Sequence, residues 1–189
     1  MIRDIILKNR SYRRFDQSAS VKRETLRELV DLARLSPSGA NAQPLKYLLS
    51  NETERNALIF MRLAWAGYLK DWPGPQEGER PAAYIVILGD TRIKPEFGVD
   101  PGIAAQSMLL GAVERGLGGC ILASIKRAEL AADLGIPEYF EILLVVALGV
   151  PVEKVVLEAV GEDGDIRYWR DEQGVHHVPK RDLDALILD

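Results

Sequence analysis

The segment AYIVILG, residues 83–89, carries apolar side chains at consecutive positions, so both faces of an extended chain would be apolar there. A strand of this kind is typical of the centre of a sheet that is covered on both sides. A second apolar run, ILLVVALGV, occupies residues 142–150. We therefore expect two buried strands, with other elements covering both faces of their sheet.

Helices are predicted on the N-terminal side of the first buried strand. Apolar residues recur at a helical period from about residue 22 to residue 35, and Ser20 is the predicted N-cap. Pro37 and Gly39 oppose any continuation of this helix. A second helix is expected over residues 53–70, after a short strand at residues 47–49.

Further helices are predicted between the two buried strands. Asp100 resembles an N-cap, followed by a proline in the first turn of a helix that reaches about Arg115. A shorter helix is expected near residues 128–134, and residues 2–6 suit a short amphipathic helix. Because helices and strands interleave without a regular alternation, the predicted class is α+β, a mixed central β-sheet flanked by helices.

Composition indicates a globular protein of one domain and argues against nucleic-acid-binding and membrane-spanning proteins. The 189 residues suit one domain, and 47% hydrophobic with 28% charged residues permit a sizeable core. A net charge of -4 argues against a nucleic-acid partner. The single cysteine, Cys120, allows no intrachain disulfide and fits a reducing compartment. The sequence contains no apolar run long enough to span a membrane, and its first residues are too charged for a signal peptide. We expect a cytoplasmic protein.

A basic cluster lies near the N-terminus, where three arginines occur within five residues beside Ser11. Guanidinium groups bind phosphate in two-pronged fashion, and a hydroxyl adds a donor. By composition alone, a solvated basic turn is the simpler interpretation of the cluster. Residues 36–44, SPSGANAQP, form a second candidate, because small residues let a backbone approach a ligand closely. An ordinary polar loop is the alternative interpretation.

Two further segments have simpler explanations when taken alone. Residues 116–119, GLGG, do not match a dinucleotide fingerprint, and a turn from helix to strand explains their glycines. Lys180 and Arg181 form a basic pair near the C-terminus. His176 and His177 have no carboxylate or cysteine at metal-ligand spacing, so they are interpreted as exposed residues of a hairpin. No metal site is predicted.

The order of these four segments carries more information than any one of them. An Arg-Ser-x-Arg cluster is followed by Pro-Ser-x-x-Asn-x-Gln-Pro, then by Gly-Leu-Gly-Gly before a strand, then by the basic pair. This order resembles the FMN-dependent nitroreductase family over nearly the whole chain. The resemblance implies a nitroreductase-like fold and a homodimer with FMN at the subunit interface, to which both subunits contribute.

The resemblance also implies roles for individual basic and polar residues. Arg10 and Ser11 are expected to hold the phosphate and ribityl end of FMN, and Lys180 and Arg181 to complete the phosphate site. Arg13 is expected near the N1/O2 edge of the flavin ring. A fixed cation there stabilises the negative charge of the reduced flavin and raises its reduction potential.

Other predicted contacts come from the small-residue loop and from the strand after the glycine turn. The resemblance places Pro37, Ser38 and Asn41 against the flavin of the partner subunit, and Gln43 belongs to the same cofactor-binding motif. It also implies that the backbone N–H at Ala123 and Ser124 faces flavin N5/O4.

The chain departs from the family pattern at several positions. Many members have arginine where this chain has Asn9, which leaves more of the phosphate contact to the other basic residues. The usual aromatic residue after Gln-Pro is Leu45 here. Ala123 stands where a glycine is common, which puts a close approach of the flavin in question.

The implied reaction is a ping-pong transfer. NADH or NADPH reduces the flavin, and a small-molecule acceptor such as a nitroaromatic or a quinone then takes the electrons. No catalytic side chain is assigned, because the cofactor carries the chemistry. The alternatives are a flavoenzyme of the same fold with another reaction, such as reductive dehalogenation or flavin destruction, or a flavin-binding protein without efficient turnover.

The C-terminal segment supports dimerisation independently. Residues 166–170 and 175–178 predict a hairpin or an extended arm, and little chain remains to cover its apolar side chains. We expect this arm, about residues 160–189, to pack on the partner subunit. Tyr68 and Trp72 lie in a proline- and glycine-rich loop, where they either form a lid over the flavin or only anchor the loop.

Overall fold

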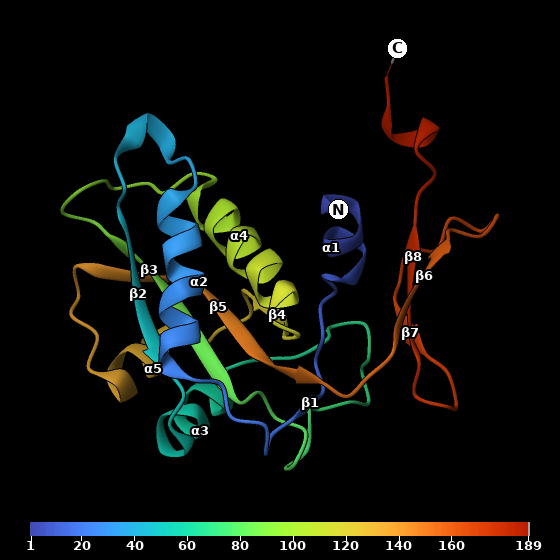
Figure 1. Cartoon of the computed structure of the whole chain (residues 1–189), viewed down its shortest axis with the longest axis horizontal. Helices are drawn as coiled ribbons and strands as arrows, with labels where there is room; N and C mark the ends of the chain where they lie inside the picture. Colours follow the sequence, from blue (N-terminus) through green and yellow to red (C-terminus); the bar gives the residue numbers. More distant parts are fainter. Residues whose placement is uncertain (189) are drawn as a thin grey trace.

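A computed structural model describes residues 1–188, and Figure 1 shows a twisted sheet between helices with an arm extending from one side. The part before the arm contains these elements in chain order: α1 (Ile2–Lys8), β1 (Phe15–Asp16), α2 (Arg23–Leu35), β2 (Leu45–Ser50), α3 (Thr53–Met61), β3 (Ala83–Asp90), α4 (Asp100–Glu114), β4 (Gly118–Leu122), α5 (Arg127–Leu134) and β5 (Phe140–Pro151). Both expected buried strands are present as β3 and β5.

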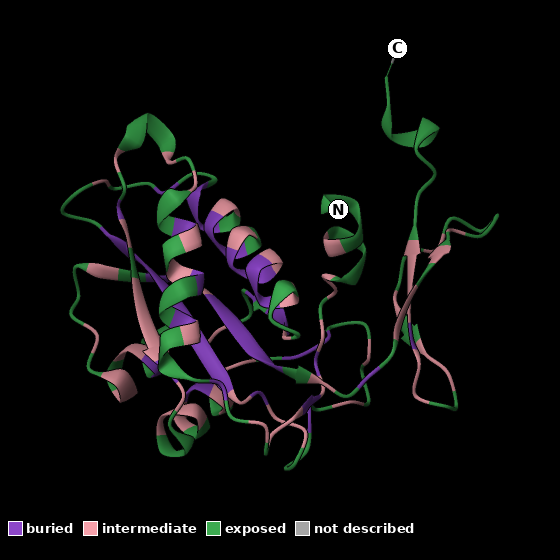
Figure 2. Ribbon diagram, in the orientation of Figure 1, coloured by how far each residue is buried: buried purple, intermediate pink, exposed green. Residues whose placement is uncertain are grey.

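The main sheet is built around β3 and β5, which pair over most of their lengths. Its order is β1-β5-β3-β2, and β4 also pairs with β5. Every pairing of named strands in this sheet is antiparallel, so the expected mixed sheet is corrected. The strand assignment itself is confirmed, because all eight residues of β3 are buried (Figure 2).

Helices cover the two faces of the sheet, as the apolar strands require. Ile85 and Ile87 of β3 pack in one cluster with α2 and α4, whereas Tyr84 and Val86 pack in a second cluster with α3 and α5. Successive strand residues point to opposite faces, so an uninterrupted apolar run supplies both clusters. Burial of these side chains is the main stabilising contribution to the fold.

Two of the predicted helices agree closely with the sequence pattern, although their predicted caps are wrong. The helix expected over 22–35 is α2, but its N-cap is Lys22 rather than Ser20, and no side chain caps it. The helix expected over 100–115 is α4, but its N-cap is Val99. Asp100 lies inside the first turn, where its carboxylate binds another loop.

The helix expected over 53–70 is much shorter than predicted, because α3 ends at Met61. Residues 64–82 form a long connection without regular helix or strand. Trp65 is buried within it, and Gly74 has a left-handed φ of 117° directly against the Trp65 indole. A side chain at position 74 would collide with that ring. Tertiary packing of Trp65 therefore overrides the helical pattern here.

Two glycines at the start of β4 allow a close approach of the chain. A side chain at Gly119 would lie 2.5 Å from the carbonyl oxygen of Ala147, and one at Gly118 would lie 2.5 Å from the ring of Tyr12. Gly116 turns the chain from α4 into β4 with a φ of 70°. The glycine run is thus explained by packing, and Gly119 holds the N-terminal basic segment against the sheet edge.

The arm is a small separate sheet of β6 (Val155–Ala159), β7 (Trp169–Arg170) and β8 (His176–Lys180). The expected hairpin is confirmed, since β7 and β8 pair antiparallel. β6 was not expected and pairs in parallel with β8. Beyond it, a single helical turn covers Asp184–Leu186.

Figure 1 shows this arm standing apart from α4 and the main sheet. Large apolar side chains stay exposed along it, including Trp169 at 44% and Leu186 at 63%. Within the described residues, no helix has both the length and the apolar character needed to cross a bilayer.

Candidate functional site

The N-terminal basic segment lies along the edge of β4, next to the start of the arm. Ser11 forms a parallel bridge with Gly119, and the Tyr12 N–H donates to the Gly119 carbonyl at 3.0 Å. Three residues later, β1 pairs with the end of β5. Arg10, Ser11 and Arg13 of this segment line a pocket together with residues of the arm.

A pocket of about 250 Å³ lies between this segment and the arm. It is lined by Asn9, Arg10, Ser11, Arg13, Tyr168, His176, Val178 and Lys180. Three of these side chains are basic and none of the lining residues is acidic, although the chain as a whole carries a net charge of -4. The local field therefore favours an anion.

Four of the predicted cofactor residues meet in this pocket: Arg10, Ser11, Arg13 and Lys180. Arg10 donates through Nη2 to the Ile6 carbonyl at 2.8 Å, while its buried Nε has no partner among the described residues. Asn9 donates to Gln106 of α4 at 3.3 Å. The residue that departs from the family pattern therefore tethers α1 to α4.

Arg13 is 9% exposed and makes three contacts through its guanidinium. Nη1 donates to the Ser11 carbonyl at 3.1 Å and lies 3.2 Å from Nε2 of His176. Its Cζ atom lies 4.8 Å from the centre of the Tyr168 ring, a cation–π distance. These contacts keep the guanidinium at the pocket wall.

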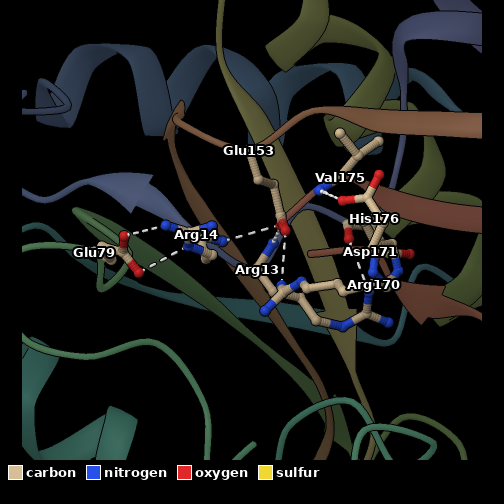
Figure 3. A network of polar contacts seen from close by, with 9 residues as sticks. Arg13, Arg14, Glu79, Glu153, Arg170, Asp171, Val175 and His176 are labelled. Atoms are coloured by element: carbon tan, nitrogen blue, oxygen red, sulfur yellow. Dashed lines mark hydrogen bonds and ion pairs between the residues drawn. The ribbon is translucent and has the colours of Figure 1, made fainter. Parts of the chain in front are cut away.

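A buried carboxylate, Glu153, organises the backbone around Arg13 (Figure 3). Its Oε1 accepts from the backbone N–H of Arg13 and, at 3.1 Å, from that of Arg14. Its Oε2 accepts from Arg170 of the arm at 2.7 Å, and its side chain is fully buried. Arg14 in turn binds Glu79 through two hydrogen bonds of 2.8 and 2.5 Å. The N-terminal segment, the root of the arm and the long loop thus meet at one network.

His176 corrects the expectation of an exposed hairpin residue, because it is only 1% exposed. Burial, together with the nearby positive charges of Arg13 and Arg170, lowers the pKa of His176 to about 4. It is therefore neutral at pH 7. A guanidinium has only donors, so Nε2 of His176 accepts from Arg13 and the proton resides on Nδ1.

His177 points to the other face of β8 and is half-buried. Its ring stacks on Trp169 at 4.1 Å, and its two nitrogens lie 3.0 Å from Glu158 and 3.2 Å from Asp171. The Glu158 hydrogen bond, reinforced by Asp171, raises the pKa of His177. Adjacent histidines therefore have opposite environments, as alternation along a strand requires.

The second predicted group lies around a tight turn that follows the C-terminal end of α2. Pro37, Ser38 and Gln43 line a separate pocket of about 220 Å³, and Asn41 is exposed on the same turn. This pocket shares no lining residue with the one around Arg13. One chain therefore does not bring the two predicted groups together.

Asp100 holds this turn in an unusual backbone conformation. Its carboxylate accepts from the Ser38 hydroxyl at 2.6 Å and from the Gly39 N–H at 2.9 Å. Burial disfavours the charge of Asp100, but these hydrogen bonds and Lys94 outweigh it and lower the pKa of the carboxyl. Ala40, Asn41 and Gln43 all have positive φ values between 50° and 53°. Such strain in non-glycine residues is common at functional sites.

The remaining predicted residues are exposed. Ala123 and Ser124 follow the end of β4, and Arg181 follows the end of β8. The Ala123 and Ser124 carbonyls accept from Arg127 at 3.2 Å and from the Ala64 N–H at 3.0 Å.

The long loop contacts the arm at the edge of the basic pocket. The rings of Tyr68 and Tyr168 lie 4.9 Å apart, and Arg170 lies 4.3 Å from the ring of Trp72. In this structure the two loop aromatics therefore anchor the loop to the arm.

Three residues of the site were not identified from the sequence: Glu153, Tyr168 and His176. Glu153 is one acidic residue among many, and only its tertiary contacts with Arg13, Arg14 and Arg170 distinguish it. For His176 a signal existed, because alternation in residues 175–178 places the two histidines on opposite faces. Which face is buried depends on the tertiary fold.

The pocket residues fit a phosphate-bearing anion on their own chemistry. Three basic side chains converge without a lining carboxylate, and a buried arginine Nε has no partner within residues 1–188. Buried donors of this kind are normally hydrogen-bonded, and charge-assisted bonds to phosphate are strong.

Comparison with known proteins gives a family match and a set of similar folds. The sequence profile of the Nitroreductase family matches residues 6–150. An FMN-dependent nitroreductase from Clostridium difficile R20291 is 22% identical with a TM-score of 0.65, over 79% of this chain and 87% of that chain. A nitroreductase family protein from Clostridium novyi NT is 19% identical with a TM-score of 0.65, and the match covers 95% of this chain and 94% of the Clostridium novyi chain.

An NADPH:FMN oxidoreductase from Vibrio harveyi, complexed with NAD+, is also similar. It is 23% identical with a TM-score of 0.62, over 80% of this chain and 69% of that chain. At these identities the likenesses establish the fold.

Proposed function

This chain belongs to the nitroreductase family, and we propose that it is an FMN-dependent oxidoreductase that works as a homodimer. The observation that carries the proposal is the basic pocket, in which Arg10, Arg13 and Lys180 converge without a lining carboxylate. A cationic pocket in an acidic chain suits a cofactor with a phosphate group.

Each predicted residue then has a distinct task. Arg10, Lys180 and Arg181 would hold the phosphate, and Ser11 would add a hydroxyl toward the ribityl chain. Arg13 would place its charge beside the N1/O2 edge of the ring. Its burial supports this role, because a fixed, desolvated cation acts more strongly on a nearby negative charge than a mobile one in water.

The partner subunit would complete the site. Pro37, Ser38 and Gln43 line a different pocket that shares no residue with the basic pocket, and Asn41 lies on the same turn, which supports their contacting the partner's flavin. Ala123 and Ser124 would offer backbone N–H groups to the flavin ring, and their exposure is compatible with that.

When bound, FMN supplies hydride acceptance from NADH or NADPH and delivery of electrons to a second molecule, here a nitroaromatic, a quinone or a similar acceptor. The chain's own residues bind and orient the cofactor and hold a positive charge where negative charge develops. No protein acid or base is required for this role.

The test is FMN titration of the purified protein, followed by addition of NADH or NADPH without oxygen. We expect quenching of flavin fluorescence on binding, and then bleaching of the flavin absorbance. Arg10→Ala should weaken FMN binding by about tenfold or more, because it removes charge-assisted hydrogen bonds. Arg23→Ala, which removes an equal charge from the exposed start of α2, is the matched control.

Different outcomes separate the alternatives. A protein that binds FMN but is not reduced by either nicotinamide would be a flavin-binding protein without turnover. Reduction without reoxidation by nitroaromatics or quinones would point to another reaction of the same fold. Absence of FMN binding would overturn the proposal.

A further inference from the structure

The contacts of the Arg13 guanidinium are all with uncharged groups. They are the Ser11 carbonyl, Nε2 of His176 and the face of the Tyr168 ring. Among residues 1–188, no carboxylate forms an ion pair with this guanidinium, although Glu153 is buried close by. This is unusual, because buried charges in proteins are normally paired.

The reason lies in how the acceptor sites of Glu153 are used. Its two oxygens accept from the backbone N–H groups of Arg13 and Arg14 and from Arg170. The Glu153 carboxylate therefore binds backbone N–H groups and Arg170 of the arm. The Arg13 guanidinium donates to neutral acceptors instead. Figure 3 shows Glu153 and His176 on opposite sides of Arg13.

Neutral acceptors have a specific advantage for a cation that must bind an anion. They fix the direction of the guanidinium without cancelling its charge, whereas a carboxylate in the same place would compete with the ligand. His176 satisfies this requirement, because it is buried against Arg13 and Arg170 and stays uncharged at pH 7.

We propose that His176 is a positioning residue for Arg13. Its neutral Nε2 fixes the guanidinium at the pocket wall and leaves the full positive charge for the anionic ligand. Taking that ligand as FMN rests on the proposed function. His176 lies in β8 of the C-terminal arm, so the arm would position a residue of the basic pocket in its own subunit.

The first test compares two substitutions at His176. His176→Gln keeps an acceptor near the position of Nε2, and His176→Phe keeps a ring but removes the acceptor. We expect His176→Phe to raise the Kd for FMN about tenfold, as expected for the loss of a hydrogen bond to a charged group, and to lower the flavin reduction potential. His176→Gln should stay close to the wild type in both measurements.

His177→Gln is the matched control on the same strand. It faces Glu158 and Asp171 rather than Arg13, so FMN affinity and potential should not change. If His176→Gln and His176→Phe were equally impaired, or both matched the wild type, the positioning role would be wrong.

A third substitution tests the charge argument directly. His176→Glu would place a carboxylate beside Arg13 and should weaken FMN binding more than His176→Phe, although it supplies an acceptor. If His176→Glu bound FMN as tightly as His176→Phe, or more tightly, the inference that a neutral acceptor is needed would be overturned.

A measurement without FMN separates this inference from the proposed function. In the FMN-free protein, urea unfolding of Arg13→Met, His176→Phe and the double variant forms a thermodynamic cycle. We expect the double variant to lose less stability than the sum of the two single losses. Additive losses would overturn the contact itself, whereas coupling in a protein that fails to bind FMN would overturn only the proposed function.

Discussion

At the scale of single residues, Glu153 connects three distant parts of the chain through one buried carboxylate. Glu153→Gln would leave Arg170 without its ion-pair partner and weaken the bonds to the Arg13 and Arg14 backbone. Breaking a buried ion pair typically costs about 3 kcal/mol. We predict a fall of that order in the free energy of unfolding, measured by urea denaturation.

The matched control for this substitution is Glu79→Gln. Glu79 also pairs with an arginine, Arg14, but its side chain is 21% exposed. Solvent screens such pairs, so its loss should cost about 1 kcal/mol or less. Equal losses for the two variants would show that burial does not distinguish them.

His176 predicts a dependence of stability on pH. In the folded state its pKa is lowered from 6.5 to about 4, so the folded state binds this proton less readily than the unfolded chain does. The free energy of unfolding should therefore fall as pH falls from 6.5 to 4, by about 3 kcal/mol at most from this group. Above pH 6.5 the group contributes no pH dependence.

The measurement compares urea unfolding of the wild type and His176→Gln at several pH values. The charged and titratable groups that influence His176 are Arg13 and Arg170, and His177 on the opposite face of β8. The raised pKa of His177 acts in the opposite sense, giving stability at low pH that is lost as pH rises through it. Because His177 is present in both proteins, their difference isolates His176. Parallel curves would contradict the prediction.

At the scale of elements, the turn after α2 depends on the first turn of α4. Asp100→Ala would leave the Ser38 hydroxyl and the Gly39 N–H without their acceptor. Unpaired donors and the strained φ values at residues 40, 41 and 43 then both favour opening of the turn. We predict a loss of about 2 kcal/mol in unfolding free energy and faster amide exchange at Gly39 and Gln43.

Asp31→Ala tests whether this effect is specific to the buried carboxylate. Asp31 pairs with Arg34 on the exposed side of α2, where its side chain is 54% exposed. Its removal should leave amide exchange at Gly39 and Gln43 unchanged. Faster exchange there in Asp31→Ala would mean that α2, rather than Asp100, controls the turn.

At the scale of the whole molecule, the arm supplies part of the pocket and carries exposed apolar side chains. Truncation after Pro151 would remove Glu153, Tyr168, His176 and Lys180 together. We predict that the truncated protein loses both FMN binding and the dimer, measured by fluorescence titration and by light scattering. A truncated protein that stayed dimeric and yellow would contradict this.

Truncation after Arg181 is the graded control. It keeps β6, β7 and β8 and all the basic residues of the pocket, and removes residues 182–189, which include the last helical turn. FMN binding should be retained. Loss of FMN binding in this variant would mean that residues 182–189 contribute to the site, although none of those that the structure describes lines the pocket.

The sequence predicts the parts of this molecule that depend on local pattern. The runs around Ile85 and Val146 are apolar at successive positions, so they indicated central strands, and the α2 and α4 patterns located two helices to within about one residue. The Arg10–Arg13 cluster and Lys180 line one pocket, and their cofactor contacts stay predictions.

What the sequence does not predict depends on contacts between distant residues. The helix expected beyond Met61 is replaced by a loop because Trp65 is buried against Gly74. β6 was missed because a parallel partner in β8, about twenty residues later, makes it a strand. The burial of His176, and therefore its neutral state, follows from the position of Arg13 and Arg170.

The pairing of β1 with β5 has a consequence for folding during synthesis on the ribosome. Arg13 and Glu153 lie 140 positions apart. Arg13 therefore leaves the ribosome long before Glu153, the carboxylate that binds its backbone, has been synthesised. At roughly 5–20 residues per second, that delay is about 7 to 28 s. During this time Phe15, fully buried in the finished protein, has no β5 to cover it. The cationic centre is thus assembled only after most of the chain has been synthesised.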